Sequence, residues 1–190
     1  MASAAGRPGS AVGNPLRDRG HADRRRAAGG PYDRGMGVII RTATLADLDV
    51  VVELSVALFA EDAGQHDGYT DLGWPSCDGH EYFGGVLDGP WTRCFLAEVD
   101  GAVCGALVGR INRESRVRPV RVAELESIYV RPERRGVGVG AALVAGFFEW
   151  ARGRGAVLAG VTAYAANVRG LGFYARNGFA ATSVHLETTL

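Results

Sequence analysis

The residues best suited to chemistry lie in a glycine-rich turn between an apolar strand and a helix. Residues 127–143 read Ser-Ile-Tyr-Val-Arg-Pro-Glu-Arg-Arg-Gly-Val-Gly-Val-Gly-Ala-Ala-Leu. Glycines at alternate positions let backbone N–H groups approach a ligand that side chains would keep away. The helix that follows adds unpaired N–H donors and the positive end of its dipole. The turn therefore predicts a binding site for an anionic group, with phosphate as the first candidate.

Two common phosphate-binding patterns do not fit this turn. A P-loop requires a lysine after its last glycine, and this chain contains no lysine. A dinucleotide fingerprint requires Gly-x-Gly-x-x-Gly and an acidic residue about 20 positions further on. Here the third glycine comes one residue early, and the next predicted strand, residues 156–164, contains no acid. The pattern that does fit is Arg-x-x-Gly-x-Gly, formed by Arg135, Gly138 and Gly140.

A second segment of interest covers residues 167–179, Asn-Val-Arg-Gly-Leu-Gly-Phe-Tyr-Ala-Arg-Asn-Gly-Phe. Asn167 suits the N-cap of a helix, and Gly178 suits its C-terminal end. Asn167 and Tyr174 lie seven residues apart, which is two turns at about 3.6 residues per turn. Both side chains are therefore expected on the same face of the helix.

Together the two segments resemble the GNAT superfamily, the N-acetyltransferases that use acyl-coenzyme A, over roughly residues 38–187. The chain departs from the family pattern at Gly170, where relatives usually carry alanine. The resemblance implies an α/β (α+β) GNAT fold, with a mixed, mostly antiparallel, twisted sheet flanked by helices in the order βα(α)βββαβαβ. It also implies acetyl-coenzyme A as co-substrate without a metal ion, and acetyl transfer to an amine by direct attack in a ternary complex.

The resemblance further implies where the coenzyme binds. Its pantetheine arm is expected beside the strand of residues 120–130, along the backbone of Ile128, Tyr129 and Val130. Asn167 is expected to hold the arm from the other side, and Arg131 or Arg134 to reach the ribose 3′-phosphate. The pyrophosphate is expected on Arg135, Gly136, Val137, Gly138, Val139, Gly140 and Ala141.

The catalytic residues expected from the resemblance are Tyr174 and a carboxylate. Tyr174 would protonate the departing thiolate, and an attacking amine must lose a proton to a base. Glu126 is the first candidate for the base, because the segment around it resembles one that holds an acidic catalytic residue in some amine-specific relatives. Glu124 is the second, because strand residues two apart point to the same face. A partly buried carboxylate has a raised pKa, which suits a base near neutrality. Whether either carboxylate or a water acts as the base stays open.

A charge bias suggests the acceptor. Between Thr42 and Thr92 there is no arginine, whereas acids are frequent from residue 61 to 88. These are Glu61, Asp62, Asp67, Asp71, Asp78, Glu81 and Asp88, interleaved with His66, Tyr69, Trp74, His80, Tyr82, Phe83 and Trp91. Carboxylates with aromatic faces favour a small cationic amine. Two alternatives remain: a protein or peptide amine in an open groove, and a sensor that binds acyl-coenzyme A without turnover. The presence of both Asn167 and Tyr174 favours activity.

Composition limits the classes of binding partner and the cellular compartment that are expected for this protein. The formal net charge of 0 divides into +4 for residues 1–35 and −4 for the remainder, which argues against nucleic acid as the main partner. Cys77, Cys94 and Cys104 show no metal-ligand spacing, and their odd number indicates a reduced, cytoplasmic environment. The sequence offers no uncharged apolar run near the roughly 18 residues of a membrane span. Homodimers are common among the relatives, and pairing of the apolar final strand across one is left open.

The chain divides into a tail and one domain. Residues 1–35 are rich in Ala, Gly, Arg and Pro and lack periodicity, which predicts disorder. Residues 36–190 are long enough for a single α/β domain with a sizeable core. Because Met36 directly precedes the first apolar strand, we expect that the true start of the protein is Met36.

The predicted elements of the domain alternate strands with helices. Asp100-Gly101 is a strong hairpin signal between two of the strands. Strands are predicted over residues 38–42, 92–99, 102–110, 120–130, 156–164 and 179–187, and helices over 45–60, 78–87, 140–152 and 167–177. Apart from the short helix, residues 61–91 are expected to be irregular.

Overall fold

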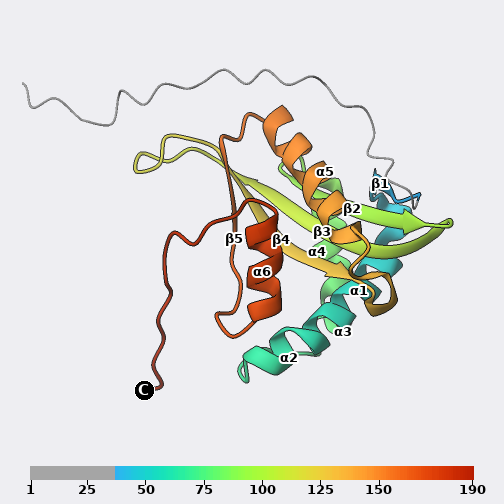
Figure 1. Ribbon diagram of the computed structural model, residues 1–190, viewed down its shortest axis with the longest axis horizontal. Helices are drawn as coiled ribbons and strands as arrows, with labels where there is room; N and C mark the ends of the chain where they lie inside the picture. The colour runs from blue at the N-terminus through green and yellow to red at the C-terminus, as the bar shows by residue number, and fades with distance from the viewer. Residues whose placement is uncertain (1–36) are drawn as a thin grey trace, which may run out of the picture. The chain divides into compact units, whose positions relative to one another are not determined.

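The computed structural model describes residues 37–190. The predicted tail and the proposed start at Met36 lie outside these residues. Five strands form one sheet in the spatial order β1-β2-β3-β4-β5 (Figure 1). They are β1 (Ile39–Thr42), β2 (Thr92–Val99), β3 (Ala102–Asn112), β4 (Val122–Val130) and β5 (Leu158–Val161). The first four pair antiparallel and β5 runs parallel to β4, which confirms the mixed, mostly antiparallel sheet.

The hairpin between β2 and β3 forms at the predicted turn. Asp100 and Gly101 both have positive φ, at 54° and 76°. Two consecutive residues in this conformation make a turn whose twist matches that of the flanking strands. This turn aligns β2 with β3 over their length, and β3 in turn positions β4.

Helices cover both faces of the sheet (Figure 1). On one face lies α5 (Val139–Gly153), whose Leu143 and Phe147 are fully buried against β3 and β4. On the other face lie α1 (Leu48–Glu61) and α4 (Gly79–Asp88), which bury Leu54 and Phe83. Alternate strand residues serve the two cores, as expected for a sheet buried on both sides.

A β-bulge interrupts β4 at Glu126. Ser127 pairs with Val108 and Leu125 with the next residue, Gly109, so that Glu126 is the extra residue of β4. A bulge bends the strand and changes which side chains face each side. Pairing between β4 and β5 ends at Leu125 and Val161. The two strands therefore separate at Glu126, and β4 continues to Val130 without β5 beside it.

The segment between α1 and α4 is more helical than predicted. It contains two single turns of helix, α2 (Ala63–His66) and α3 (Trp74–Cys77). Pro75 stands in the first turn of α3, where its missing N–H costs no hydrogen bond. The predicted short helix is confirmed as α4.

The prediction of a last strand over residues 179–187 is wrong. After α6 (Val168–Arg176), residues 179–190 carry no strand. Alternating residues give a segment the potential to form a strand, but a strand also needs a neighbour that accepts its hydrogen bonds. β5 is likewise shorter than predicted. Within the described residues, no helix is long and apolar enough to cross a membrane.

Candidate active site

The glycine-rich turn adopts the conformation that the sequence predicted. A short 3-10 helix, η2 (Pro132–Arg134), follows β4, and the chain then turns into α5. Gly136 and Gly138 have φ of 77° and 96°, which other residues adopt only with strain. Gly138 is the N-cap of α5, and the N–H of Ala142 donates to its carbonyl at 3.0 Å. The N–H groups of residues 139–141 therefore have no acceptor within the helix.

The turn has room for a ligand in front of these donors. A Cβ atom placed on Gly136 or Gly138 would meet nothing within 4 Å, so both glycines border open space. A Cβ on Gly140 would instead meet the ring of Phe173 at 3.0 Å. Gly140 thus permits the close approach of α5 and α6. Free N–H groups, a helix N-terminus and open space together fit a diphosphate.

The side chain of Arg135 is occupied by groups of the protein. Its Nε donates to the carbonyl of Val130 at 2.7 Å, and its two terminal nitrogens bind the carboxylate of Glu61 at 2.6 and 2.7 Å. The guanidinium also lies 5.3 Å from the ring centre of Tyr129. Arg135 lowers the pKa of Glu61 through these hydrogen bonds. Arg135 therefore joins the end of α1 to the turn, and the expected phosphate contacts fall to the backbone.

The other two arginines near the turn are also paired with carboxylates. Arg131 donates to Glu53 at 2.8 Å, and Arg134 lies 3.5 Å from Asp100. Both were expected to reach a 3′-phosphate, and both would have to exchange a carboxylate for it.

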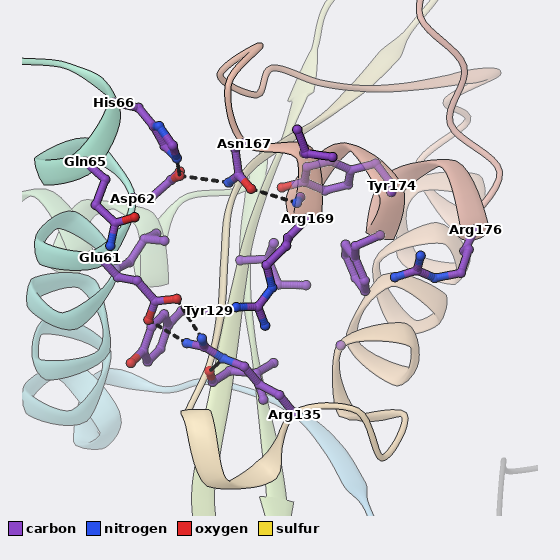
Figure 2. A pocket seen from close by; sticks show the side chains of 18 of the residues that line it. Glu61, Asp62, Gln65, His66, Tyr129, Arg135, Asn167, Arg169, Tyr174 and Arg176 are labelled. Carbon is purple, nitrogen blue, oxygen red and sulfur yellow. Dashed lines mark hydrogen bonds and ion pairs between the residues drawn. The ribbon is translucent and has the colours of Figure 1, made fainter.

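A cavity of about 610 Å³ runs along β4 between α1–α2 and α6 (Figure 2). A volume of this size is typical of small-molecule sites, which span about 300–1,000 Å³. Eight residues predicted for the site line it: Ile128, Tyr129, Val130, Arg135, Gly136, Gly140, Asn167 and Tyr174. Five others do not: Glu126, Val137, Gly138, Val139 and Ala141. The second candidate base, Glu124, is not among the lining residues either. The structure thus brings residues of both sequence motifs to one cavity.

Asn167 caps α6 as predicted and also bridges the cavity. Its Oδ1 accepts from the N–H of Gly170 at 2.7 Å, and its Nδ2 donates to Asp62 at 2.9 Å (Figure 2). A Cβ on Gly170 would lie 2.8 Å from the Asn167 side chain. The glycine that departs from the family pattern therefore makes room for the cap. Asp62 belongs to the predicted acidic region, but it lines the cavity next to Asn167.

Tyr174 lies on the α6 wall of the cavity (Figure 2). Its ring packs edge-on against Phe173 and Phe179, with centroid distances of 5.4 and 5.7 Å. Burial, with a smaller contribution from the charge of Asp62, raises the pKa of Tyr174 to about 12. The phenol is therefore protonated at neutral pH and able to donate a hydrogen bond.

Glu124 and Glu126 lie on the α1–α4 face of the sheet, in different environments. Arg110 on β3 donates to one carboxylate oxygen of Glu126, and the hydroxyl of Tyr82 on α4 lies 3.4 Å from the other. Glu124 has no ion pair among the described residues. Burial, followed by the charge of Glu126, raises the pKa of Glu124. Its partner on β3 is Arg110, whose side chain binds Glu126, and its partner on β5 is Gly160, which places no side chain over the carboxylate.

Two of the other acids in residues 61–88 stabilise turns. Asp67 accepts from the backbone of Tyr69 and the hydroxyl of Thr70, and Asp71 accepts from the backbone of Gly73. Among residues 37–190, no group of three or more His, Cys, Asp or Glu side chains is arranged to hold a metal ion.

Two aromatic residues of this region, Trp74 and Tyr82, form with Phe59 of α1 a row that ends at Glu126. Phe59 stacks on Trp74 at 5.6 Å, and Trp74 meets Tyr82 edge-on at 5.2 Å. Tyr82 then contacts Glu126. The row leads to the point where β4 and β5 separate.

Sequence reasoning missed Arg110, Arg169 and Arg176. Arg169 and Arg176 line the cavity from α6, and their spacing of seven residues places them on one helix face. The spacing of the two arginines could have been used to predict that they share a helix face with a common function. The contact of Arg110 with Glu126 had no comparable signal, because it depends on the register of β3 against β4.

Comparison with known proteins yields consistent matches. Residues 58–179 match the sequence model of the acetyltransferase (GNAT) family. An uncharacterised N-acetyltransferase of Methanocaldococcus jannaschii is 29% identical over 140 residues, which are 74% of this chain and 59% of that protein. One of Archaeoglobus fulgidus is 30% identical over 137 residues, 72% of this chain and 88% of that protein. The chain thus spans less than two thirds of the first relative and most of the second.

A solved structure shows the same fold. It is the aminoglycoside N-acetyltransferase AAC(6')-Iy in complex with CoA, with a TM-score of 0.65 and 24% identity. The match covers 83% of this chain and 97% of that one. At this identity the likeness establishes the arrangement of helices and strands.

Proposed function

Because this chain belongs to the acetyltransferase (GNAT) family, we propose that it transfers the acetyl group of acetyl-coenzyme A to a small cationic amine. The transfer proceeds by direct attack in a ternary complex. The observation that carries the proposal is the cavity, which joins the glycine-rich turn to Tyr174 and Asn167. The free thiols of Cys77, Cys94 and Cys104 are in keeping with a cytoplasmic enzyme.

The coenzyme would bind along β4. The N–H groups of residues 139–141 and the dipole of α5 hold its diphosphate. Arg169 and Arg176 add positive charge from α6. Beyond Leu125, β4 has no β5 partner. The N–H of Arg131 donates to Cys104 on β3, and strand amides point alternately to either side. The amides of Ile128 and Val130, on either side of Tyr129, are therefore able to pair with the pantetheine arm as an added strand would.

The acceptor nitrogen must be deprotonated before it attacks, because an alkylammonium group has a pKa of about 10.4. We assign the base to Glu124 and a positioning role to Glu126, which exchanges the first and second candidates of the sequence. Both carboxylate oxygens of Glu126 already have partners, Arg110 and Tyr82. Glu124 has no ion pair among the described residues, and burial raises its pKa, which suits a base working near neutrality.

The balanced reaction requires two proton movements. One proton passes from the ammonium to Glu124, and the neutral nitrogen attacks the thioester carbonyl. As the C–S bond breaks and the amide forms, the nitrogen gives its second proton to the leaving thiolate, which departs as the thiol of coenzyme A. The thiol that forms from the leaving thiolate has a pKa of about 8.5. This pKa is below that of Tyr174, which is about 12. Full proton transfer from Tyr174 is therefore uphill, and its contribution is a hydrogen bond to the developing thiolate.

The preference for a cation rests on the aromatic row and the carboxylates beside it. Aromatic faces and carboxylates both attract ammonium groups. The row of Phe59, Trp74 and Tyr82 ends at Glu126, where the strands separate. The similarly folded aminoglycoside N-acetyltransferase is named for amine-bearing acceptors, which supports the same class here.

The test measures coenzyme binding by calorimetry and thiol release over a panel of polyamines, aminoglycosides, amino acids and peptides. We expect heat with acetyl-coenzyme A and thiol release with the small cations only. Release with peptides alone would assign a protein acceptor. Binding without release on any acceptor would indicate a sensor, and no binding would overturn the acetyltransferase assignment.

A further inference from the structure

Asp62 is a carboxylate of the cavity wall that the proposed reaction leaves without a role. It stands where α1 ends and α2 begins, as the C-cap of the first helix and the N-cap of the second. Its backbone N–H donates to the carbonyl of Leu58 at 2.8 Å, and its carbonyl accepts from the N–H of His66 at 3.2 Å. These hydrogen bonds on both sides hold the backbone of Asp62 in place, so its side chain extends from a fixed point.

The side-chain amide of Asn167 is held at both of its ends. An amide has an acceptor end and a donor end. The acceptor end caps α6, since Oδ1 accepts from the N–H of Gly170 at 2.7 Å. The donor end is bound by Asp62, since Nδ2 donates to its carboxylate at 2.9 Å (Figure 2). The two contacts together give the amide one orientation.

One hydrogen of this amide is left for a ligand. An NH₂ group carries two donor hydrogens, and among residues 37–190 the carboxylate of Asp62 is the one acceptor that Nδ2 has. Asp62 and Asn167 both line the cavity, so an acceptor bound there is able to take the second hydrogen. The pantetheine arm of coenzyme A contains amide groups, whose carbonyls are such acceptors.

We propose that Asp62 is a positioning residue for acetyl-coenzyme A: its carboxylate holds the Asn167 amide so that Nδ2 gives its second hydrogen to a carbonyl of the pantetheine arm. The inference rests on the proposed function, because it takes the cavity to be the coenzyme site. A hydrogen bond to a charged acceptor is stronger than one between neutral groups, so Asp62 is able to hold the amide before the coenzyme binds. A donor that is already oriented loses less conformational freedom on binding.

Competition between Asp62 and the arm is the opposite interpretation, and the contacts argue against it. Competition would require Nδ2 to release Asp62 before it binds the arm, but Nδ2 has a hydrogen for each of the two acceptors. Asp62 is also retained by its backbone, and Nε2 of His66 lies 3.8 Å from the same carboxylate oxygen. Removal of the carboxylate should therefore weaken coenzyme binding, whereas competition predicts tighter binding.

The first test titrates the protein with acetyl-coenzyme A by calorimetry. Asp62→Ala should weaken binding by about tenfold, the scale of one hydrogen bond. Asp62→Asn should bind as tightly as the wild type, because its side-chain oxygen accepts the same bond. Asp49→Ala is the matched control, since it removes an equal charge from α1, where the carboxylate is 97% exposed, and it should change nothing. Circular dichroism verifies that each variant is folded.

A second measurement separates positioning from a general effect on the cavity. The ligand is 3′-phosphoadenosine 5′-diphosphate, the part of the coenzyme without the pantetheine arm. Wild type and Asp62→Ala should bind it equally, because the proposed contact is made to the arm. The double variant Asp62→Ala with Asn167→Ala should bind acetyl-coenzyme A no more weakly than Asn167→Ala alone, since Asp62 acts through Asn167.

The outcomes distinguish this inference from the function on which it rests. Unchanged or tighter binding of acetyl-coenzyme A by Asp62→Ala would overturn the inference. An equal loss of affinity for both ligands, or a double variant weaker than Asn167→Ala, would overturn it as well. Each of these results leaves the proposed function in place, which fails instead if the wild-type protein binds no acetyl-coenzyme A.

Discussion

Glu124 and Glu126 show how two like residues on one strand acquire different chemistry. They lie two positions apart on the same face, but the bulge places Glu126 where Arg110 and Tyr82 reach it. Glu124 stays paired with Gly160 inside the sheet, where burial raises its pKa. The environment of each carboxylate, and not its type, therefore sets its expected role.

The first prediction concerns the proton transfer. Glu124→Gln should lower kcat by about 100-fold or more, the usual range for loss of a general base. A base acts only when deprotonated, so wild-type activity should fall as the pH falls through the raised pKa of Glu124. The variant should lose this acid limb. Steady-state thiol release measured against pH checks both effects.

Glu126→Gln provides the contrast, since a positioning residue should affect KM more than kcat and leave the acid limb in place. Glu149→Gln is the matched control, because Glu149 is exposed on α5 away from the cavity. If Glu124→Gln kept the acid limb while Glu126→Gln abolished it, the two roles would be reversed.

At the scale of elements, the junction of β4 and α5 forms the proposed anion site. The strand ends, η2 reverses the chain, and two glycines with positive φ lead it into α5, whose first N–H groups have no acceptor within the helix. The three glycines act differently. Gly136 and Gly138 permit the turn, whereas Gly140 permits the contact between α5 and Phe173.

The second prediction tests Gly138. Alanine in the left-handed region costs roughly 1–2 kcal/mol, and relief of that strain would move the N–H groups of the turn. Gly138→Ala should therefore weaken binding of acetyl-coenzyme A by about tenfold, which corresponds to about 1.4 kcal/mol. Calorimetric titration measures this change.

Gly153→Ala is the matched control at the other end of α5. A Cβ there meets nothing within 4 Å, and the position has no positive φ. Alanine should leave the affinity unchanged and raise the melting temperature slightly, because glycine is a poor helix former. Equal affinity in wild type and Gly138→Ala would remove the turn from the binding site.

At the scale of the whole domain, polar bridges connect α1–α2 with the opposite wall of the cavity. Glu61 binds Arg135 on the turn, and Asp62 binds Asn167 at the start of α6. These contacts join segments that lie 74 and 105 residues apart in the chain. They fix the width of the cavity that the sheet alone would leave open.

The third prediction concerns the stability of this connection. Arg135 lowers the pKa of Glu61, so the ion pair contributes fully above the unfolded pKa of about 4.3 and is lost as the pH falls further. Both side chains are partly exposed, so Glu61→Gln should lower the unfolding free energy at neutral pH by about 1 kcal/mol or less. Urea unfolding of variant and wild type, at neutral pH and near pH 3, measures the difference. It should shrink in acid, and Glu149→Gln should change neither value. A difference that persists in acid would show that packing, not charge, explains the effect.

The sequence by itself determined the local features of this protein. The hairpin at Asp100-Gly101, the glycine-rich turn and the cap of α6 by Asn167 all appear where they were predicted. Each depends on φ preferences and on hydrogen bonds within a few residues, which neighbouring residues specify. Except for the last strand, the order of strands and helices followed from the same local signals together with the family resemblance.

Only the tertiary structure decided which distant segments contact one another. It paired Arg135 with Glu61 and Glu126 with Arg110, and it left residues 179–187 without the strand that their pattern predicts. Ion pairs and strand pairing depend on which distant segment lies alongside, and no local preference encodes that neighbour. The one-residue bulge at Glu126 shifts the register between β3 and β4, and the local sequence gives no sign of that shift.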